Sequence, residues 1–196
     1  GEKMLSTHAY EEALAHLRRG LEDRGVATSG TETAPDRQCA DLLLGLGRAL
    51  VATLPLAGRQ GAVDALQRSF DYYMQTGSHD SAIAVALTPV PTLYGPRGLA
   101  RMAARALSLV PADSLQAGYL LVQFGMWEYI ENSTRQAALE AFEHAMAIAR
   151  QHGDPQLELR AEKVRIPYLR LPWQERYEGF QRVLALCRRM QHPEAE

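Results

Sequence analysis

The amino-acid sequence predicts an all-α fold, a solenoid in which antiparallel helix pairs stack one after another. The first observation is a signature with anchoring residues at spacings of four and then three, which begins at Ala62, Ala100, Ala138 and Arg176. The copies start at equal intervals, and a fixed repeat period in the range of about 20 to 50 residues is typical of stacked repeats. The second observation is that each signature falls on one face of a helix, which must then be buried against a neighbour.

Composition favours the same fold class. Alanine and leucine are abundant, β-branched residues are sparse, and apolar and polar residues show no sustained alternation of the kind found in strands. The formal net charge of −2 gives no field that would require nucleic acid or an anionic membrane as a partner. Cys39 and Cys187 lie inside helical patterns far apart and are expected to be reduced. Because the sequence shows no membrane span and no signal peptide, a cytoplasmic location is expected.

The repeat is expected to run through residues 1–196 as a single domain. A half repeat is predicted first, followed by four helix pairs, over residues 8–24, 36–77, 80–110, 113–153 and 154–190 respectively. The chain starts almost directly in a helical pattern, so a fragment of a larger regulator is expected.

Turn chemistry sets the boundaries between these helices. Asp113 with Gln116, and Ser133 with Gln136, have the spacing of capping boxes and are expected to begin the two helices of the third pair. Prolines at positions 89, 91 and 96 exclude a continuous helix there. Residues 89–97 are therefore expected to bulge out of the stack as a loop.

A family resemblance is clearest in the third pair, at Leu121, Phe124, Gly125, Ala138, Phe142 and Ala145. This order of small and aromatic residues resembles the tetratricopeptide repeat (TPR), which implies a right-handed superhelix of antiparallel helix pairs. The strings AYEEALAHLRRGLE, ALEAFEHAMAIARQHGD and YLRLPWQERYEGFQRVLAL look like the repeat region of LuxR-type, maltose-regulator-like bacterial signal-transduction ATPases. That resemblance implies an upstream ATPase module and a downstream helix-turn-helix.

Motifs for catalysis are missing from the sequence. The phosphate loop of an ATPase needs a lysine after a glycine, whereas both lysines, Lys3 and Lys163, follow glutamate. No histidine stands at a ligand spacing from another histidine or a cysteine, and no Gly-x-Ser-x-Gly elbow occurs. We therefore expect that the protein is not an enzyme and that it needs no metal or cofactor.

The aromatic residues divide by position along the predicted helices. Four phenylalanines match the packing register and are expected in the core: Phe70, Phe124, Phe142 and Phe180. The TPR resemblance places the first helix of each pair along a concave groove, and the residues expected there are Asp41, Arg48, Tyr119, Met126, Tyr129, Arg160 and Val164. Aromatic, methionine and arginine side chains suit the capture of a peptide or a small ligand. The alternative, that these residues only complete the packing between repeats, is equally open.

Two functions remain in view. The first is a non-catalytic sensor and scaffold module that binds a protein partner or a small inducer and relays this to attached ATPase and DNA-binding domains. This segment itself is not expected to touch nucleic acid. The second is a simple protein-interaction adaptor or self-association domain, which includes a homo-oligomer and senses no ligand.

Overall fold

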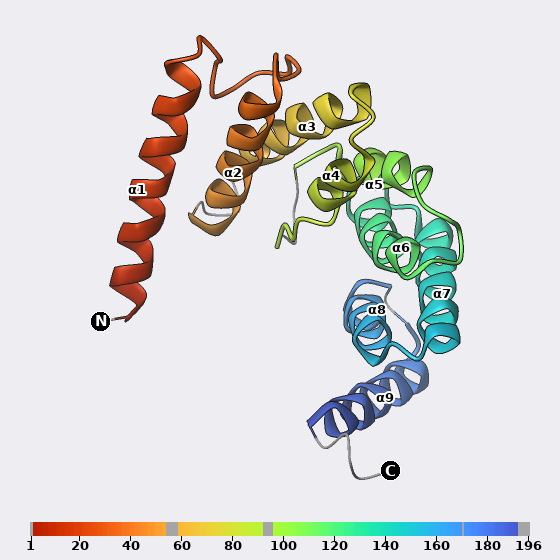
Figure 1. Cartoon of the computed structure of the whole chain (residues 1–196). Coiled ribbons are helices and arrows are strands. Elements are labelled where there is room, and N and C mark those ends of the chain that lie inside the picture. The colour runs from red at the N-terminus through yellow and green to blue at the C-terminus, as the bar shows by residue number, and fades with distance from the viewer. Residues whose placement is uncertain (1, 54–58, 92–95, 170, 192–196) are drawn as a thin grey trace. The chain divides into compact units, whose positions relative to one another are not determined.

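The computed structural model describes residues 2–53, 59–91, 96–169 and 171–191, which form nine α-helices and one short π-helix and contain no strand (Figure 1). The predicted all-α fold class is confirmed. The elements in chain order are α1 (Glu2–Glu22), α2 (Arg37–Thr53), α3 (Gln60–Gln75), α4 (His79–Ala86), α5 (Leu99–Leu107), α6 (Leu115–Trp127), the π-helix η2 (Glu128–Asn132), α7 (Arg135–His152), α8 (Pro155–Tyr168) and α9 (Trp173–Gln191).

The helices group into two compact units, Gly1–Met102 and Ala103–Glu196, whose boundary falls inside α5. The single repeat domain with its four pairs, and the right-handed superhelix, stay predictions. The predicted loop over residues 89–97 includes residues 92–95, which lie outside the described residues.

In the first unit, α1 and α2 pack as antiparallel neighbours. Gly20 of α1 faces Leu42 of α2, and Gly45 of α2 faces Leu17 of α1. Residue numbers therefore fall along α2 as they rise along α1. Leu21, one turn after Leu17 on the same face of α1, is fully buried. The helix α1 thus covers α2 as the second helix of a preceding pair would.

The helices α2 and α3 approach so closely that no side chain fits at one point between them. A Cβ atom added to Gly47 of α2 would lie 2.7 Å from Leu66 Cγ and 3.0 Å from the backbone oxygen of Ala62 on α3. At the other end of the pair, the hydroxyl of Tyr73 on α3 donates a hydrogen bond to Asp41 on α2. The two helices are therefore antiparallel.

The same contact closes α6 and α7 in the second unit. A Cβ atom added to Gly125 of α6 would lie 3.1 Å from the backbone oxygen of Ala138 and 3.2 Å from Phe142 Cε1 on α7. Ala138 and Phe142 stand two repeat periods after Ala62 and Leu66. These two copies of the repeat signature therefore mark the same kind of contact between two helices.

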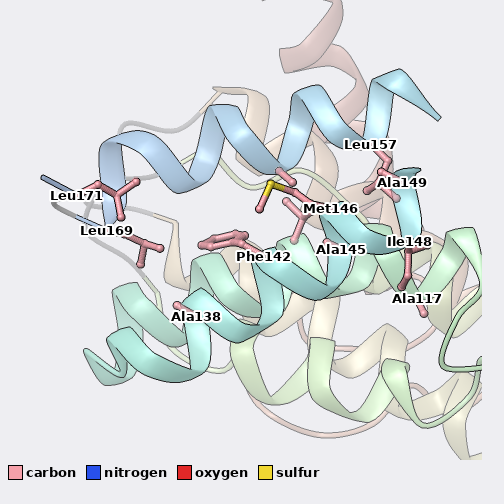
Figure 2. Close-up of a cluster of buried hydrophobic side chains, with 12 residues drawn as sticks. Ala117, Ala138, Phe142, Ala145, Met146, Ile148, Ala149, Leu157, Leu169 and Leu171 are labelled. Carbon is pink, nitrogen blue, oxygen red and sulfur yellow. The ribbon is translucent and has the colours of Figure 1, made fainter. Parts of the chain in front are cut away.

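A cluster of buried apolar side chains joins α6, α7 and α8, and Figure 2 shows Phe142 and Met146 of α7 near its centre. The Arg135 Nε of α7 donates a hydrogen bond to the Leu169 carbonyl oxygen at 3.1 Å, after the last turn of α8. At the opposite end, Arg150 of α7 pairs with Glu158 in the first turn of α8. The helices α7 and α8 are therefore also antiparallel.

Both predicted capping boxes of the third pair are wrong. The N-cap of α6 is Ser114 and not Asp113, because the Ser114 hydroxyl accepts a hydrogen bond from the Ala117 N–H at 3.1 Å. Ser133 does not cap α7, because η2 precedes it and its own backbone is left-handed, with φ of 58°. Thr134 takes the N-cap position instead, without a side-chain hydrogen bond to the helix. The wider π turn displaces the start of α7 by a residue.

The four phenylalanines predicted to lie in the core have different surroundings. Phe70 and Phe142 are fully buried, as predicted, and Phe124 is half-buried. Phe180 is 48% exposed, so its assignment to the core is wrong. The fourth copy of the repeat signature, which contains Phe180, therefore does not pack as the other copies do.

The physical reason is that α8 and α9 make contact through different residues. One close contact is at Gly179 of α9, where an added Cβ atom would lie 2.8 Å from Ile166 Cδ1 of α8. The small residue stands on the second helix of this pair and not on the first. Arg176, at the leading position of the signature, is exposed. The helix α9 therefore turns a different face towards α8.

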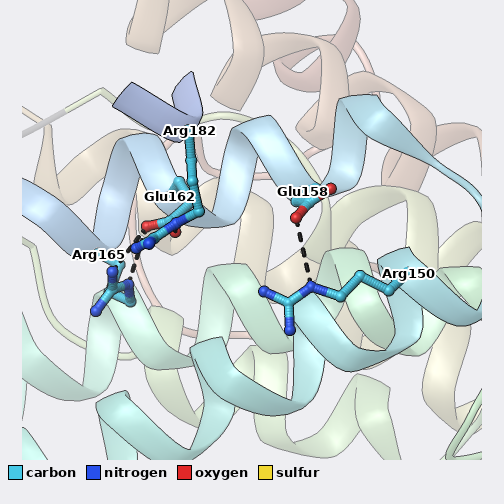
Figure 3. Close-up of polar contacts among 5 residues, drawn as sticks. All are labelled: Arg150, Glu158, Glu162, Arg165 and Arg182. Atoms are coloured by element: carbon cyan, nitrogen blue, oxygen red, sulfur yellow. Dashed lines mark hydrogen bonds and ion pairs between the residues drawn. The ribbon is translucent and has the colours of Figure 1, made fainter. Parts of the chain in front are cut away.

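An ion triad around a buried carboxylate attaches α9 to α8 (Figure 3). Glu162 of α8 is 1% exposed and accepts hydrogen bonds from Arg182 Nε of α9 at 2.6 Å and from Arg165 Nε of its own helix at 3.0 Å. A carboxylate taken out of water is stable only when it is well paired, because the lost hydration must be replaced. The two arginines supply that pairing.

Replacing Gly47 or Gly125 by alanine is expected to lower the free energy of unfolding by about 1–3 kcal/mol, because the backbone oxygen that faces each glycine cannot move aside. Gly61→Ala in α3 is the matched control, since no atom lies within 4 Å of its added Cβ and alanine favours a helix. Urea unfolding measures all three variants. If Gly61→Ala lowers the free energy of unfolding as much as the other two substitutions, the close contact is not the cause of their effect.

Glu162→Gln is expected to lower the free energy of unfolding by about 3–5 kcal/mol, because Arg165 and Arg182 lose their shared carboxylate. Glu158→Gln breaks the pair with Arg150, whose side chain is 59% exposed, and should cost about 1 kcal/mol or less. Thermal and urea unfolding of both variants check the difference. If both substitutions lower the free energy of unfolding equally, burial of Glu162 does not make its ion pairs more stabilising than an exposed pair.

Candidate binding groove

One face of α8 lines a hollow of about 340 Å³. The lining residues are Gln156, Leu159, Arg160, Lys163 and Val164 of α8, with Met190 of α9. The five residues of α8 share one side of the helix, because positions three, four, seven and eight apart lie on the same face. Leu157 and Ala161, on another side of α8, are buried in the core cluster. The hollow is therefore formed by the side of α8 that the core does not use.

A tyrosine of α6 positions Arg160 in this hollow. The guanidinium carbon of Arg160 lies 5.7 Å from the centre of the Tyr119 ring, a cation–π contact. The Tyr119 hydroxyl donates a hydrogen bond to Asp154 Oδ2 at 3.2 Å, while Asp154 Oδ1 caps α8 by accepting the N–H groups of Gln156 and Leu157. Burial, and then the Asp154 carboxylate, raise the pKa of Tyr119 above its ordinary value, so its hydroxyl remains a donor at neutral pH.

The hollow combines cationic groups with apolar walls. Arg160 and Lys163 supply two positive charges, and Leu159, Val164 and Met190 supply apolar surface. This combination suits a ligand that joins an anionic group to an apolar body, because the charges orient it and the walls remove it from water. Among the described residues, no three His, Cys, Asp or Glu side chains lie close enough together to hold a metal ion. The chemistry that the arrangement offers is binding.

The structure brings together three of the five groove residues predicted in this unit. Arg160 and Val164 line the hollow, and Tyr119 contacts Arg160. Met126 and Tyr129 do not line it, and both are half-buried against the core cluster. Half burial is compatible with ligand capture and with packing between repeats alike. The groove assignment therefore stays a prediction.

The other two predicted groove residues belong to the first unit. Asp41 accepts the hydroxyl of Tyr73, whose side chain is 2% exposed. Burial, and then the Asp41 carboxylate, raise the pKa of Tyr73 to about 12. Asp41 thus joins α2 to α3. Arg48 is exposed on the same side of α2, seven residues further on, and its place in a groove stays a prediction.

Sequence reasoning missed Gln156, Leu159, Lys163 and Met190 as lining residues. The three on α8 share a helix face with Arg160, so the helical spacing around that residue could have found them. No spacing in the sequence indicates Met190, which lies on another helix. Its position beside the hollow depends on how α9 packs on α8 through Gly179 and Glu162, and that packing departs from the repeat.

A second hollow of about 370 Å³ is lined by Glu158 of α8 and by Arg182, Ala185, Leu186 and Arg189 of α9. Its main charged groups already have partners. Glu158 pairs with Arg150 at 3.4 Å, and Arg182 pairs with Glu162 at 2.6 Å. The hollow around Arg160 is therefore the better candidate for a ligand.

Comparison with known protein families finds a match to the family model described as Anaphase-promoting complex subunit 5, over residues 56–159. This range contains α3 to α7 and the beginning of α8. Comparisons with curated proteins and with solved structures give no match. Of the helices that the structure describes, none has both the length and the apolar character needed to cross a membrane.

The pKa of Tyr73 predicts how the stability of the α2–α3 pair depends on pH. Its folded value of about 12 lies above the ordinary value of 10.0, so the contribution to stability is complete below pH 10 and is lost as the pH rises through about 12. We expect the free energy of unfolding to fall over this range in the parent. It should fall less in Tyr73→Phe, because phenylalanine has no hydroxyl that can ionise at position 73. Urea unfolding at several pH values measures this. Identical falls in both proteins would contradict the prediction.

Proposed function

The chain belongs to the Anaphase-promoting complex subunit 5 family, whose model matches more than half of its 196 residues, and we propose that it is a scaffold that binds a partner segment on α8. The TPR-like helical repeats of this family are a scaffold-type module for protein interaction. The observation that carries the proposal is the hollow in which Tyr119 holds Arg160 beside apolar walls.

The partner segment is acidic and carries an apolar anchor. Its carboxylate meets Arg160 and Lys163, and its apolar side chain lies on Leu159, Val164 and Met190. Arg160 loses little conformational freedom on binding, because the Tyr119 ring already fixes its direction. A volume of about 340 Å³ holds one or two side chains, so the hollow binds a short sequence motif and not the surface of a folded domain.

This role needs no catalytic step and no cofactor. In this role the protein lies in the cytoplasm and makes no direct contact with nucleic acid. Contact with a peptide segment suffices for a scaffold, since binding alone brings the partner to the other parts of an assembly.

A second candidate is the sensor module of a LuxR-type regulator, which would relay inducer binding to attached ATPase and DNA-binding domains. Two observations favour it: the resemblance of the repeat strings, and a hollow whose volume of about 340 Å³ falls in the range of small-molecule sites. An adaptor that senses no ligand, or that associates with itself, is the remaining alternative.

The test uses short synthetic peptides that contain one leucine and two glutamates, and matched peptides with glutamine in place of glutamate. Isothermal titration calorimetry is expected to show binding of the glutamate peptides, weakened about tenfold by Arg160→Ala, because a charge-assisted contact is lost. Arg101→Ala, an exposed arginine of the first unit, is the matched control and should change nothing.

Calorimetry, thermal unfolding and mass measurements together separate the three functions. Equal affinity for glutamate and glutamine peptides, or equal loss in the control variant, would contradict the proposed peptide site. A metabolite that raises the melting temperature of the parent but not of Arg160→Ala would favour the sensor. Mass that rises with protein concentration, without any ligand response, would favour self-association.

A further inference from the structure

The outer face of α9 carries an exposed apolar stripe, formed by Trp173, Tyr177, Phe180 and Leu184. The exposed fractions of these side chains are 75%, 52%, 48% and 50%. Their spacing of four, three and four residues places them on one side of the helix. Gly179 and Leu186 are the buried residues of α9, on its other side. So much exposed apolar surface in one line marks an interaction site.

The residues of this stripe have equivalents one repeat period earlier in the chain. Leu139, Phe142 and Met146 of α7 correspond to Tyr177, Phe180 and Leu184. Those three residues are buried or half-buried in the core cluster that α6 and α8 complete. The helix α8 precedes α9 and packs on it, and α6 likewise precedes α7 and packs on it. None of the described helices packs on α9 as α8 packs on α7. The stripe therefore lacks its second neighbour among the described residues.

The repeat also indicates the charge of that neighbour. Arg188 of α9 corresponds to Arg150 of α7, one repeat period earlier, and Arg150 pairs with Glu158 in the first turn of α8 at 3.4 Å (Figure 3). Arg188 lies at the margin of the stripe, four residues after Leu184, and is exposed. Arg176 lies at the opposite margin and is also exposed. The carboxylates of α9, Glu175 and Glu178, lie off the stripe in the helical register.

The first helix of the chain does not share this property. On the side of α1 that faces away from α2, the exposed residues include Glu12, His16 and Arg19. Tyr10, its one exposed large apolar residue in the described range, is in register with the buried Leu14 and Leu21. A polar face suits a side of a helix that stays in water. The outer face of α9 is apolar instead.

We propose that the stripe of α9 docks an amphipathic α-helix of a partner protein, which lies antiparallel to α9 and places a carboxylate of its first turn opposite Arg188. The apolar side of this helix covers Tyr177, Phe180 and Leu184, whose equivalents on α7 are covered by α6 and α8 together. This surface goes beyond the peptide site, because the two share no residue.

A second copy of this chain fits the stripe less well. The margins of the stripe carry arginines and no carboxylate, so a second α9 offers no anionic partner for Arg188. An anionic membrane surface would satisfy the arginines, but α7 shows that this face of the repeat is shaped for a helix. Both occupants are outcomes of the test below.

The test uses a synthetic helical peptide with a leucine stripe and a glutamate in its first turn, and a twin with lysine in place of that glutamate. Fluorescence of Trp173 reports binding, since it is 75% exposed while Trp127 is already buried at 2%. We expect the glutamate peptide to bind about three- to fivefold more tightly than its twin, and Arg188→Glu to reverse this order. Phe180→Ser with Leu184→Ser should weaken binding at least about tenfold.

Arg189→Glu is the matched control, because Arg189 points to the second hollow and should leave the peptide order unchanged. Arg160→Ala should also leave it unchanged, which separates this surface from the peptide site. Circular dichroism confirms that the stripe variants are folded. The proposal is overturned if neither peptide binds, if both bind equally, or if Arg188→Glu keeps the order. It is also overturned if Phe180→Ser abolishes a concentration-dependent rise in mass or binding to phosphatidylserine vesicles while no peptide binds.

Discussion

Two helix pairs, α2–α3 and α6–α7, close where a glycine on the first helix meets the backbone of an alanine on the second. At Gly47 and at Gly125 the space for a Cβ atom is taken by a backbone oxygen and by a large apolar side chain four residues beyond that alanine. A contact that includes backbone fixes how far apart the helices lie, because backbone cannot change rotamer. The two alanines, Ala62 and Ala138, stand two repeat periods apart, so the repeat signature marks the same contact in both pairs.

The last pair shows what changes when this contact is absent. The equivalents of Ala138 and Phe142 in α9 are Arg176 and Phe180, and neither is buried. Gly179 and the Glu162 triad hold α9 on α8 instead, and two consequences follow. Met190 reaches the hollow beside Arg160, and the apolar residues of the signature face outward. The candidate groove and the exposed stripe thus both arise from one local departure from the repeat.

Much of the fold could be predicted from the sequence, because helical spacing and a fixed period are local signals. The burial of Ala62, Ala138 and Phe142 followed directly from them. The capping box at Ser133 failed because a π turn has no clear sequence signal, and the left-handed backbone of that residue shows only in three dimensions. For the candidate site, Arg160 and Val164 could be found by moving one period along the chain. Met190 could not, because its position depends on contacts of α9 that break the period.

The nuclear Overhauser spectrum of the protein tests whether Gly47 and Gly125 lie against the neighbouring helix as described. We predict cross-peaks from the Gly47 Hα protons to the methyl groups of Leu66, and from the Gly125 Hα protons to the methyl group of Ala141 and the ring of Phe142, since these groups face the Cβ position of each glycine. Their absence in the folded protein, with these resonances assigned, would contradict the account.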